Sequence, residues 1–163
     1  MTRKIIVLAL FVSLFVPALR HVEAAPRRLD ISPLAERIFT LINVQRAAAG
    51  LRPVTVNAML MAEAQRFSGI QADLGTLSHR GNDGTNAGQR LTRAGYNWRF
   101  YGENLAAGHI TADDVVTAWM NSPSHRAIML HPRAQEIGIG HTHRDNDPAR
   151  YVNYYAMEVG QPR

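Results

Sequence analysis

Apolar residues spaced three or four positions apart predict several separate helices between residues 32 and 130. The best-marked helix starts at Ser32 and Pro33, a capping residue followed by a first-turn proline, and stops at Gly50. Asn57 caps a second predicted helix that runs towards Gly75. Further helices are predicted over 87–93, after Thr111, and after Ser122 and Pro123, where the last carries His125 in its first turn.

Extended patterns replace the helical ones at three places. Residues 96–101 alternate and are aromatic, which predicts a short strand leading to Glu103. Two further strands, 137–143 and 151–159, flank a polar turn at 144–148. Helices first and a hairpin last indicate one α+β domain in which helices pack on an antiparallel sheet.

The N-terminus has the pattern of an export signal. A short positive start precedes an apolar run over 5–16, and small or short residues follow at 22–24. We therefore expect a signal peptide over 1–24, cleaved between Ala24 and Ala25, and a secreted or periplasmic product. The run is shorter than the ~20 residues that cross a bilayer, which disfavours the alternative of a retained membrane anchor. Residues 25–31 are then a lead-in, and 32–163 form the domain.

Composition removes several kinds of chemistry. The chain has no cysteine, so disulfides, thiol nucleophiles and thiolate metal sites are excluded. Its only lysine, Lys4, lies in the predicted signal peptide, which excludes Schiff-base chemistry in the mature protein. The charge of +5 falls to +3 once three basic residues and one acidic residue are removed with that peptide. The arginines are scattered and form no basic stripe, so nucleic-acid binding is not expected.

Three residues from separate segments are the main candidates for chemistry: His79, Glu103 and His125. Two imidazoles and a carboxylate suit a divalent transition metal and also move protons near neutral pH. Gly102 and Asn104 are expected to hold Glu103 in a tight local turn. The alternative is structural: Glu103 caps a buried turn, and the histidines pack against neighbouring side chains.

Other histidines and familiar catalytic patterns add less. His141 and His143 lie two residues apart in a predicted strand and share a face, so they could bind a metal, although they sit beside a turn and are expected to face water. His109 and His131 are interpreted as loop or surface residues. Ser124 adjoins His125, but adjacency does not make a catalytic triad. The sequence also lacks the Gly-x-Ser-x-Gly and His-Glu-x-x-His motifs.

Four segments together resemble the CAP superfamily of cysteine-rich secretory, antigen 5 and pathogenesis-related proteins, in particular its short bacterial SCP-like extracellular members. They are 102–106, 119–122, 124–126 and 136–140. The resemblance spans about 34–159. It implies a three-layer α-β-α sandwich with a central antiparallel sheet and a large cleft on one side.

In that family two histidines and two glutamates line the cleft, and some members bind zinc or another divalent metal there. By resemblance His79, Glu103 and His125 match three of these residues, while Ser122 stands where the second glutamate would be. One carboxylate fewer weakens the expected hold on a dication. Glu136 could compensate if the sheet turned it inward.

The expected function follows from this cleft. We expect a ligand- or metal-binding module of the envelope or cell exterior, with a small molecule, a lipid or an envelope component as its partner. The alternative is a metal-dependent hydrolase in which His79 and His125 bind the metal and Glu103 is the general base. A structural envelope protein with a vestigial cleft is the third hypothesis.

Overall fold

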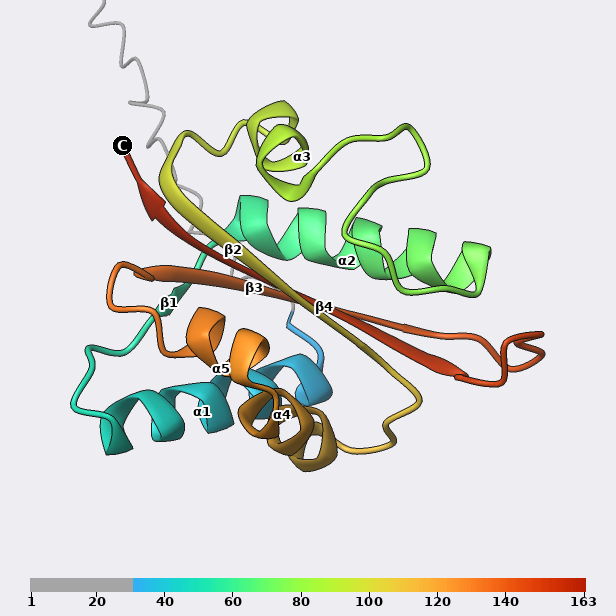
Figure 1. Cartoon of the computed structure of the whole chain (residues 1–163), viewed down its shortest axis with the longest axis horizontal. Helices are drawn as coiled ribbons and strands as arrows, with labels where there is room; N and C mark the ends of the chain where they lie inside the picture. The colour runs from blue at the N-terminus through green and yellow to red at the C-terminus, as the bar shows by residue number, and fades with distance from the viewer. Residues whose placement is uncertain (1–30) are drawn as a thin grey trace, which may run out of the picture.

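The computed structural model describes residues 31–163, which form three layers with a sheet between two groups of helices (Figure 1). One group consists of α2 (Ala58–Leu74) and α3 (Ala87–Arg93). The other consists of α1 (Pro33–Ala48), α4 (Ala112–Asn121) and α5 (Pro123–Met129). The strands are β1 (Thr55–Val56), β2 (Trp98–Ala107), β3 (Glu136–His143) and β4 (Asn153–Pro162). The predicted α+β class and α-β-α layering are confirmed.

The strand order in the sheet is β1-β3-β4-β2, which leaves the long strand β2 at one edge. The pairs β3–β4 and β4–β2 are antiparallel, as expected. The two-residue strand β1 adds in parallel to β3, so the sheet is mixed. Strand β2 also runs past the predicted end at residue 101, because its pairing with β4 continues to Ala107. Glu103 therefore lies inside a strand and not in the turn that the sequence suggested.

The helices begin where the capping residues predict. The Ser32 hydroxyl accepts a hydrogen bond from the Ala35 N–H, and the Asn57 side chain accepts from the N–H groups of Met59 and Leu60. Gly75 ends α2 in a left-handed conformation with φ of 62°. At α5 the prediction holds only in part. Ser122 precedes the helix, yet among the described residues its hydroxyl makes no capping bond and lies 3.3 Å from the Ser124 hydroxyl.

Two glycines of β3 let helix α2 lie directly on the sheet. A Cβ atom on Gly138 would lie 2.1 Å from the Leu60 carbonyl carbon, and one on Gly140 would lie 2.1 Å from the Ala64 carbonyl oxygen. Only a hydrogen atom fits in those positions. The spacing of α2 from the sheet, and hence of everything α2 carries, depends on these two residues.

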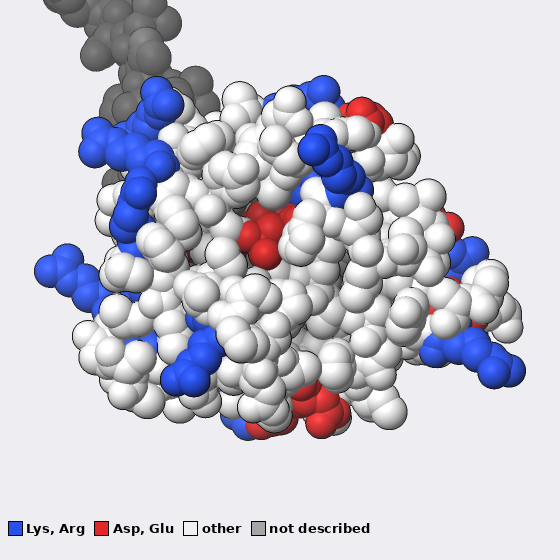
Figure 2. Space-filling view, in the orientation of Figure 1, with Lys and Arg blue, Asp and Glu red and all other residues white. Residues whose placement is uncertain are grey.

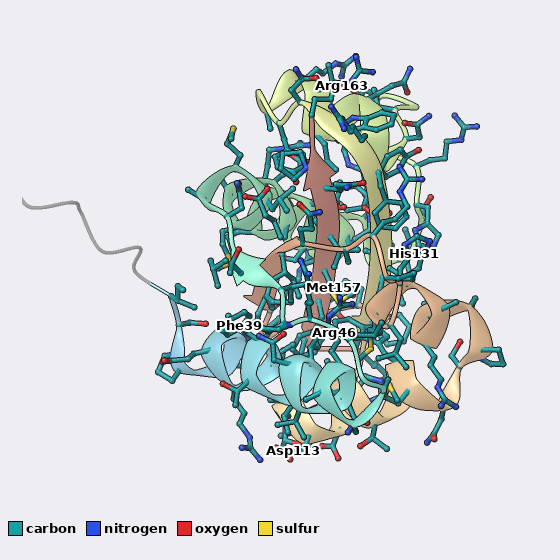
Figure 3. The ribbon with its side chains drawn as sticks, turned by 90° about the vertical axis from the view of Figure 1, so that its left-hand side faces the viewer. Phe39, Arg46, Asp113, His131, Met157 and Arg163 are labelled. Atoms are coloured by element: carbon teal, nitrogen blue, oxygen red, sulfur yellow. The ribbon has the colours of Figure 1, made fainter. Side chains whose placement is uncertain are left out.

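The main core lies between the sheet and the α1/α4/α5 layer, and it encloses one arginine. Arg46 of α1 points towards the sheet beside Met157 (Figure 3) and is 1% exposed. Its guanidinium donates to four carbonyl oxygens, at 2.8–3.1 Å. These belong to Arg52, Met129, His131 and Ala134. Arg46 thus fastens α1 to the segment between α5 and β3.

The predicted signal peptide and all of the lead-in except Ile31 fall outside the described residues. None of the helices between residues 31 and 163 combines the length and the hydrophobicity that a bilayer-spanning segment needs.

Candidate functional site

Strand β2 positions the site because its successive side chains point to opposite faces of the sheet. Glu103 faces the α2/α3 layer, where its neighbours are Glu63 and Arg90. Asn104 faces the other layer, and its Nδ2 donates to the His125 carbonyl oxygen at 2.9 Å. Gly102 also faces that side, since a Cβ there would lie 2.8 Å from Ile128 of α5. The residues flanking Glu103 thus seat α5 and do not form the expected tight turn.

His79 and Glu103 form a direct pair. The Nδ1 atom of His79 lies 2.7 Å from Oε1 of Glu103. Because a carboxylate only accepts, Nδ1 carries the hydrogen, and Nε2 remains for another partner. The imidazole is 62% exposed, whereas the carboxylate is 3% exposed. The hydrogen bond to Glu103 raises the pKa of His79, so the ring favours its charged form.

Arg90 holds this pair from behind. Its guanidinium contacts the second oxygen of Glu103, and its Nε donates to Glu63 at 3.1 Å. It also donates to the carbonyl oxygens of His79 and Thr85 at 3.2 and 3.1 Å. Since Arg90 contacts both the carboxylate of Glu103 and the backbone carbonyl oxygen of His79, it fixes these two residues relative to each other.

A further carboxyl group lies beneath Glu103. Glu158 of β4 is the register partner of Glu103, so the two side chains share one face of the sheet. Glu158 is fully buried, and neither oxygen has a hydrogen-bond partner among the described residues. A guanidinium nitrogen of Arg90 lies 3.8 Å from Oε1 of Glu158. Burial, and then the charge of Glu103, raise the pKa of Glu158 well above its usual value, which favours the neutral acid.

His125 approaches from the opposite helical layer. It lies in the first turn of α5, and its backbone is held by Asn104. Burial, followed by the nearby charge of His79, lowers the pKa of His125. The neutral ring was expected from its place near a helix start, but its causes are burial and a second imidazole. Figure 2 shows acidic atoms at the floor of a hollow over β2, between the two layers.

The remaining predicted site residues lie elsewhere or make other contacts. Ser122 pairs with Ser124 at the junction of α4 and α5. Glu136 accepts from the Tyr96 hydroxyl at 2.7 Å, so its carboxylate already has a partner. His131 stacks on Phe100 with ring centroids 4.0 Å apart.

Three residues of the site were missed from the sequence: Glu63, Arg90 and Glu158. Glu158 carried a usable signal, because it is the only charged residue in the apolar segment 153–162. Glu63 and Arg90 carried none. Each lies in an ordinary helix, and only the packing of α2 and α3 on the sheet brings them to Glu103.

Comparisons with known proteins agree on one family. Residues 39–157 match the model of the cysteine-rich secretory protein family, CAP. The chain is 30% identical over 112 residues to the uncharacterized protein YkwD of Bacillus subtilis, covering 69% of this chain and 44% of that protein. The chain thus spans less than half the length of this curated relative.

Two solved structures show the same fold. An outer surface protein of Borrelia burgdorferi matches with a TM-score of 0.71 and 22% identity, covering 78% of this chain and 92% of that one. An extracellular protein of Bacillus anthracis that contains an SCP domain matches with a TM-score of 0.69 and 24% identity, covering 78% of this chain and 40% of that one.

Proposed function

The chain belongs to the cysteine-rich secretory protein family, CAP, whose extracellular-type domain spans residues 39–157, and on that premise we propose that it is an exported binding module. Its ligand is a small molecule or lipid that carries an acidic group. The acidic group binds between His79 and His125, in the hollow over β2. The pair of His79 and Glu103, anchored by Arg90, is the observation that carries this proposal.

Charge favours an acidic group at this place. Arg90 balances Glu103, and the raised pKa of Glu158 favours its neutral acid, so protonation of His79 leaves these four side chains with one net positive charge. Arg66 balances Glu63 through two hydrogen bonds of 2.7 and 2.8 Å. The Nε2–H of a protonated His79 is then a charged donor backed by a buried carboxylate, and such hydrogen bonds are stronger than neutral ones.

The same pair bears on metal binding. A carboxylate behind an imidazole is the usual support for a metal-ligating histidine, and Nε2 of His79 together with His125 would supply two ligands for zinc. Within 31–163, however, no three His, Cys, Asp or Glu side chains form a metal-binding group. Each oxygen of Glu103 already has a partner, His79 or Arg90, so a metal ion or an attacking water would have to share that oxygen with it. The metal-dependent hydrolase therefore remains the alternative.

A fluorescent fatty acid and its methyl ester test the proposal. Residues 25–163 should bind the acid more tightly than the ester. His79→Ala should weaken binding of the acid by about tenfold to a hundredfold, the worth of a charged hydrogen bond. His109→Ala is the matched control, because the Tyr155 hydroxyl donates to the His109 carbonyl oxygen and, among residues 31–163, the His109 ring makes no hydrogen bond.

Two results would decide against the proposal. One is equal binding of acid and ester; the other is equal binding by His79→Ala and His109→Ala. Zinc-dependent hydrolysis of an ester or peptide that disappears in Glu103→Gln would support the hydrolase instead.

A further inference from the structure

A second group of polar side chains lies at the far end of the sheet. His143 is the register partner of Asn153, and His141 is the partner of Tyr155. Positions two apart on one strand, and partners on adjacent strands, share a face. His141, His143 and Asn153 therefore lie on one face, where the β3–β4 pair projects past α1, α4 and α5 (Figure 1).

The two imidazoles converge on a single atom. Nε2 of His141 lies 3.0 Å from Oδ1 of Asn153, and Nδ1 of His143 lies 2.9 Å from the same oxygen. Ligands at right angles around a metal, with bonds of about 2.1 Å, are about 3.0 Å apart. These two nitrogen–oxygen distances are ordinary hydrogen-bond lengths, and they also match the separation of neighbouring ligand atoms around one metal ion.

The hydrogen-bonding needs of these groups also favour a cation. An amide oxygen carries no hydrogen, so both ring nitrogens facing it must donate. The other nitrogen of His143 lies 2.9 Å from a carboxylate oxygen of Asp145, which requires a second hydrogen on the same ring. A neutral His143 cannot meet both demands; a doubly protonated His143 can, and so can a metal ion that replaces the hydrogens facing Asn153. A dication would accept lone pairs from the two rings and the amide oxygen together.

Neighbouring groups orient the rings. Asp145 holds the far nitrogen of His143, as carboxylates do behind metal-ligating histidines. The ring of His141 stacks on Tyr155 with centroids 4.9 Å apart. The backbone before Asn153 is unusual, because Val152 has φ of 65°, which a β-branched residue rarely adopts. The Val152 N–H is held there by Asp147 at 2.9 Å.

We propose that His141, His143 and Asn153 bind a divalent transition-metal ion at the open end of the β3–β4 pair. Two imidazoles select zinc, nickel or copper over magnesium and calcium. The amide oxygen is the third ligand, and water completes the shell. This site is separate from the cleft: Asn153 and Glu158 are five residues apart on β4, about 16 Å, and point to opposite faces.

The test is nickel titration by calorimetry on residues 25–163, with His79→Ala/His125→Ala as background so that the cleft contributes no imidazole. We expect one equivalent of nickel to bind, and magnesium not to bind. Adding His141→Ala or His143→Ala should weaken binding at least tenfold. Asp145→Asn should weaken it by about 10–100-fold through loss of orientation. Asn153→Asp should tighten it, because a carboxylate brings charge to the ion.

A matched control and a second measurement keep the outcome clear. His131→Ala removes an imidazole that stacks on Phe100 and should leave nickel affinity unchanged. Copper should broaden the amide NMR signals of 141–145 and 153 in the unmutated protein, which requires no variant to fold. Absence of binding in the background variant, unchanged binding in His141→Ala/His143→Ala, or broadening confined to residues around 79 and 125 would each overturn the proposal.

Discussion

Replacing Gly138 by alanine should destabilise the domain far more than the added methyl group suggests. The new Cβ would lie 2.1 Å from the carbonyl carbon of Leu60 and 2.4 Å from the backbone nitrogen of Met61. Non-bonded carbon atoms prefer about 3.5 Å or more, so helix and strand must separate by about 1.4 Å. The obstacle is helix backbone, which cannot rotate away as a side chain can.

The magnitude follows from what α2 would lose. Overpacking a core typically costs about 1–3 kcal/mol, and this site should lie at or above the top of that range. Separation would loosen Leu60, Ala64 and Phe67, each 0% exposed, from the sheet. A loss of about 3 kcal/mol lowers the melting temperature of a domain of this size by about 10 °C.

Urea unfolding followed by circular dichroism and tryptophan fluorescence measures the effect. Gly69→Ala is the control, because it makes the same glycine-to-alanine change on α2, the helix that packs against Gly138 of β3. Among the described residues a Cβ at Gly69 meets only the Thr142 hydroxyl oxygen, at 3.8 Å. Alanine in a helix is favoured over glycine by about 1 kcal/mol, so this variant should be more stable than the parent. The reasoning fails if Gly138→Ala unfolds within 0.5 kcal/mol of the parent, or if the two variants lose the same stability.

Three further predictions concern buried charge. Arg46→Met should lower the free energy of unfolding by at least about 3 kcal/mol, because four carbonyl oxygens lose their donor, and a smaller loss in urea unfolding would contradict this. Glu103→Gln should lower the pKa of His79 towards its usual value in an NMR titration, and an unchanged pKa would contradict the pairing of the two residues. In the parent, the raised pKa of His79 stabilises the fold fully below about pH 6.5 and progressively less as the pH rises through the folded-state pKa. Glu158→Gln should be more stable than the parent at pH 7 but not at pH 4, because a carboxyl whose pKa is raised in the folded state destabilises the fold as the pH rises above the unfolded-state pKa of about 4.3. An equal difference in the free energy of unfolding at both pH values would refute this.

Local signals in the sequence were enough to place the helices. Ser32 and Asn57 bond the first-turn N–H groups that their positions imply, and Gly75 takes the left-handed conformation that ends α2. These features depend on residues only a few positions apart. For the same reason the strands 137–143 and 151–159 were found nearly in place, since apolar runs around a polar turn are a local pattern.

The surroundings of Glu103 could not be read locally. Its strand extends to Ala107 because β4, about 50 residues later, pairs with it throughout. Asn104 was expected to bond its own turn, and instead it holds His125, 21 residues away. Such contacts follow from how the layers meet. The sequence could name the two histidines and the glutamate, but it could not supply Arg90, which fixes His79 and Glu103 relative to each other.

The four carbonyl oxygens that accept from Arg46 constrain the order in which parts of the chain can fold. Three of its four acceptors lie at residues 129–134, more than 80 positions later in the chain. At about 5–20 residues per second, a ribosome reaches those residues several seconds after it has completed α1. Until then the Arg46 guanidinium lacks three of the four carbonyl oxygens that accept its hydrogen bonds, so burying it would leave its donors unpaired. We therefore expect truncated chains that stop before residue 129 to stay unfolded. The full chain should likewise remain unfolded until nearly all of it has been synthesised.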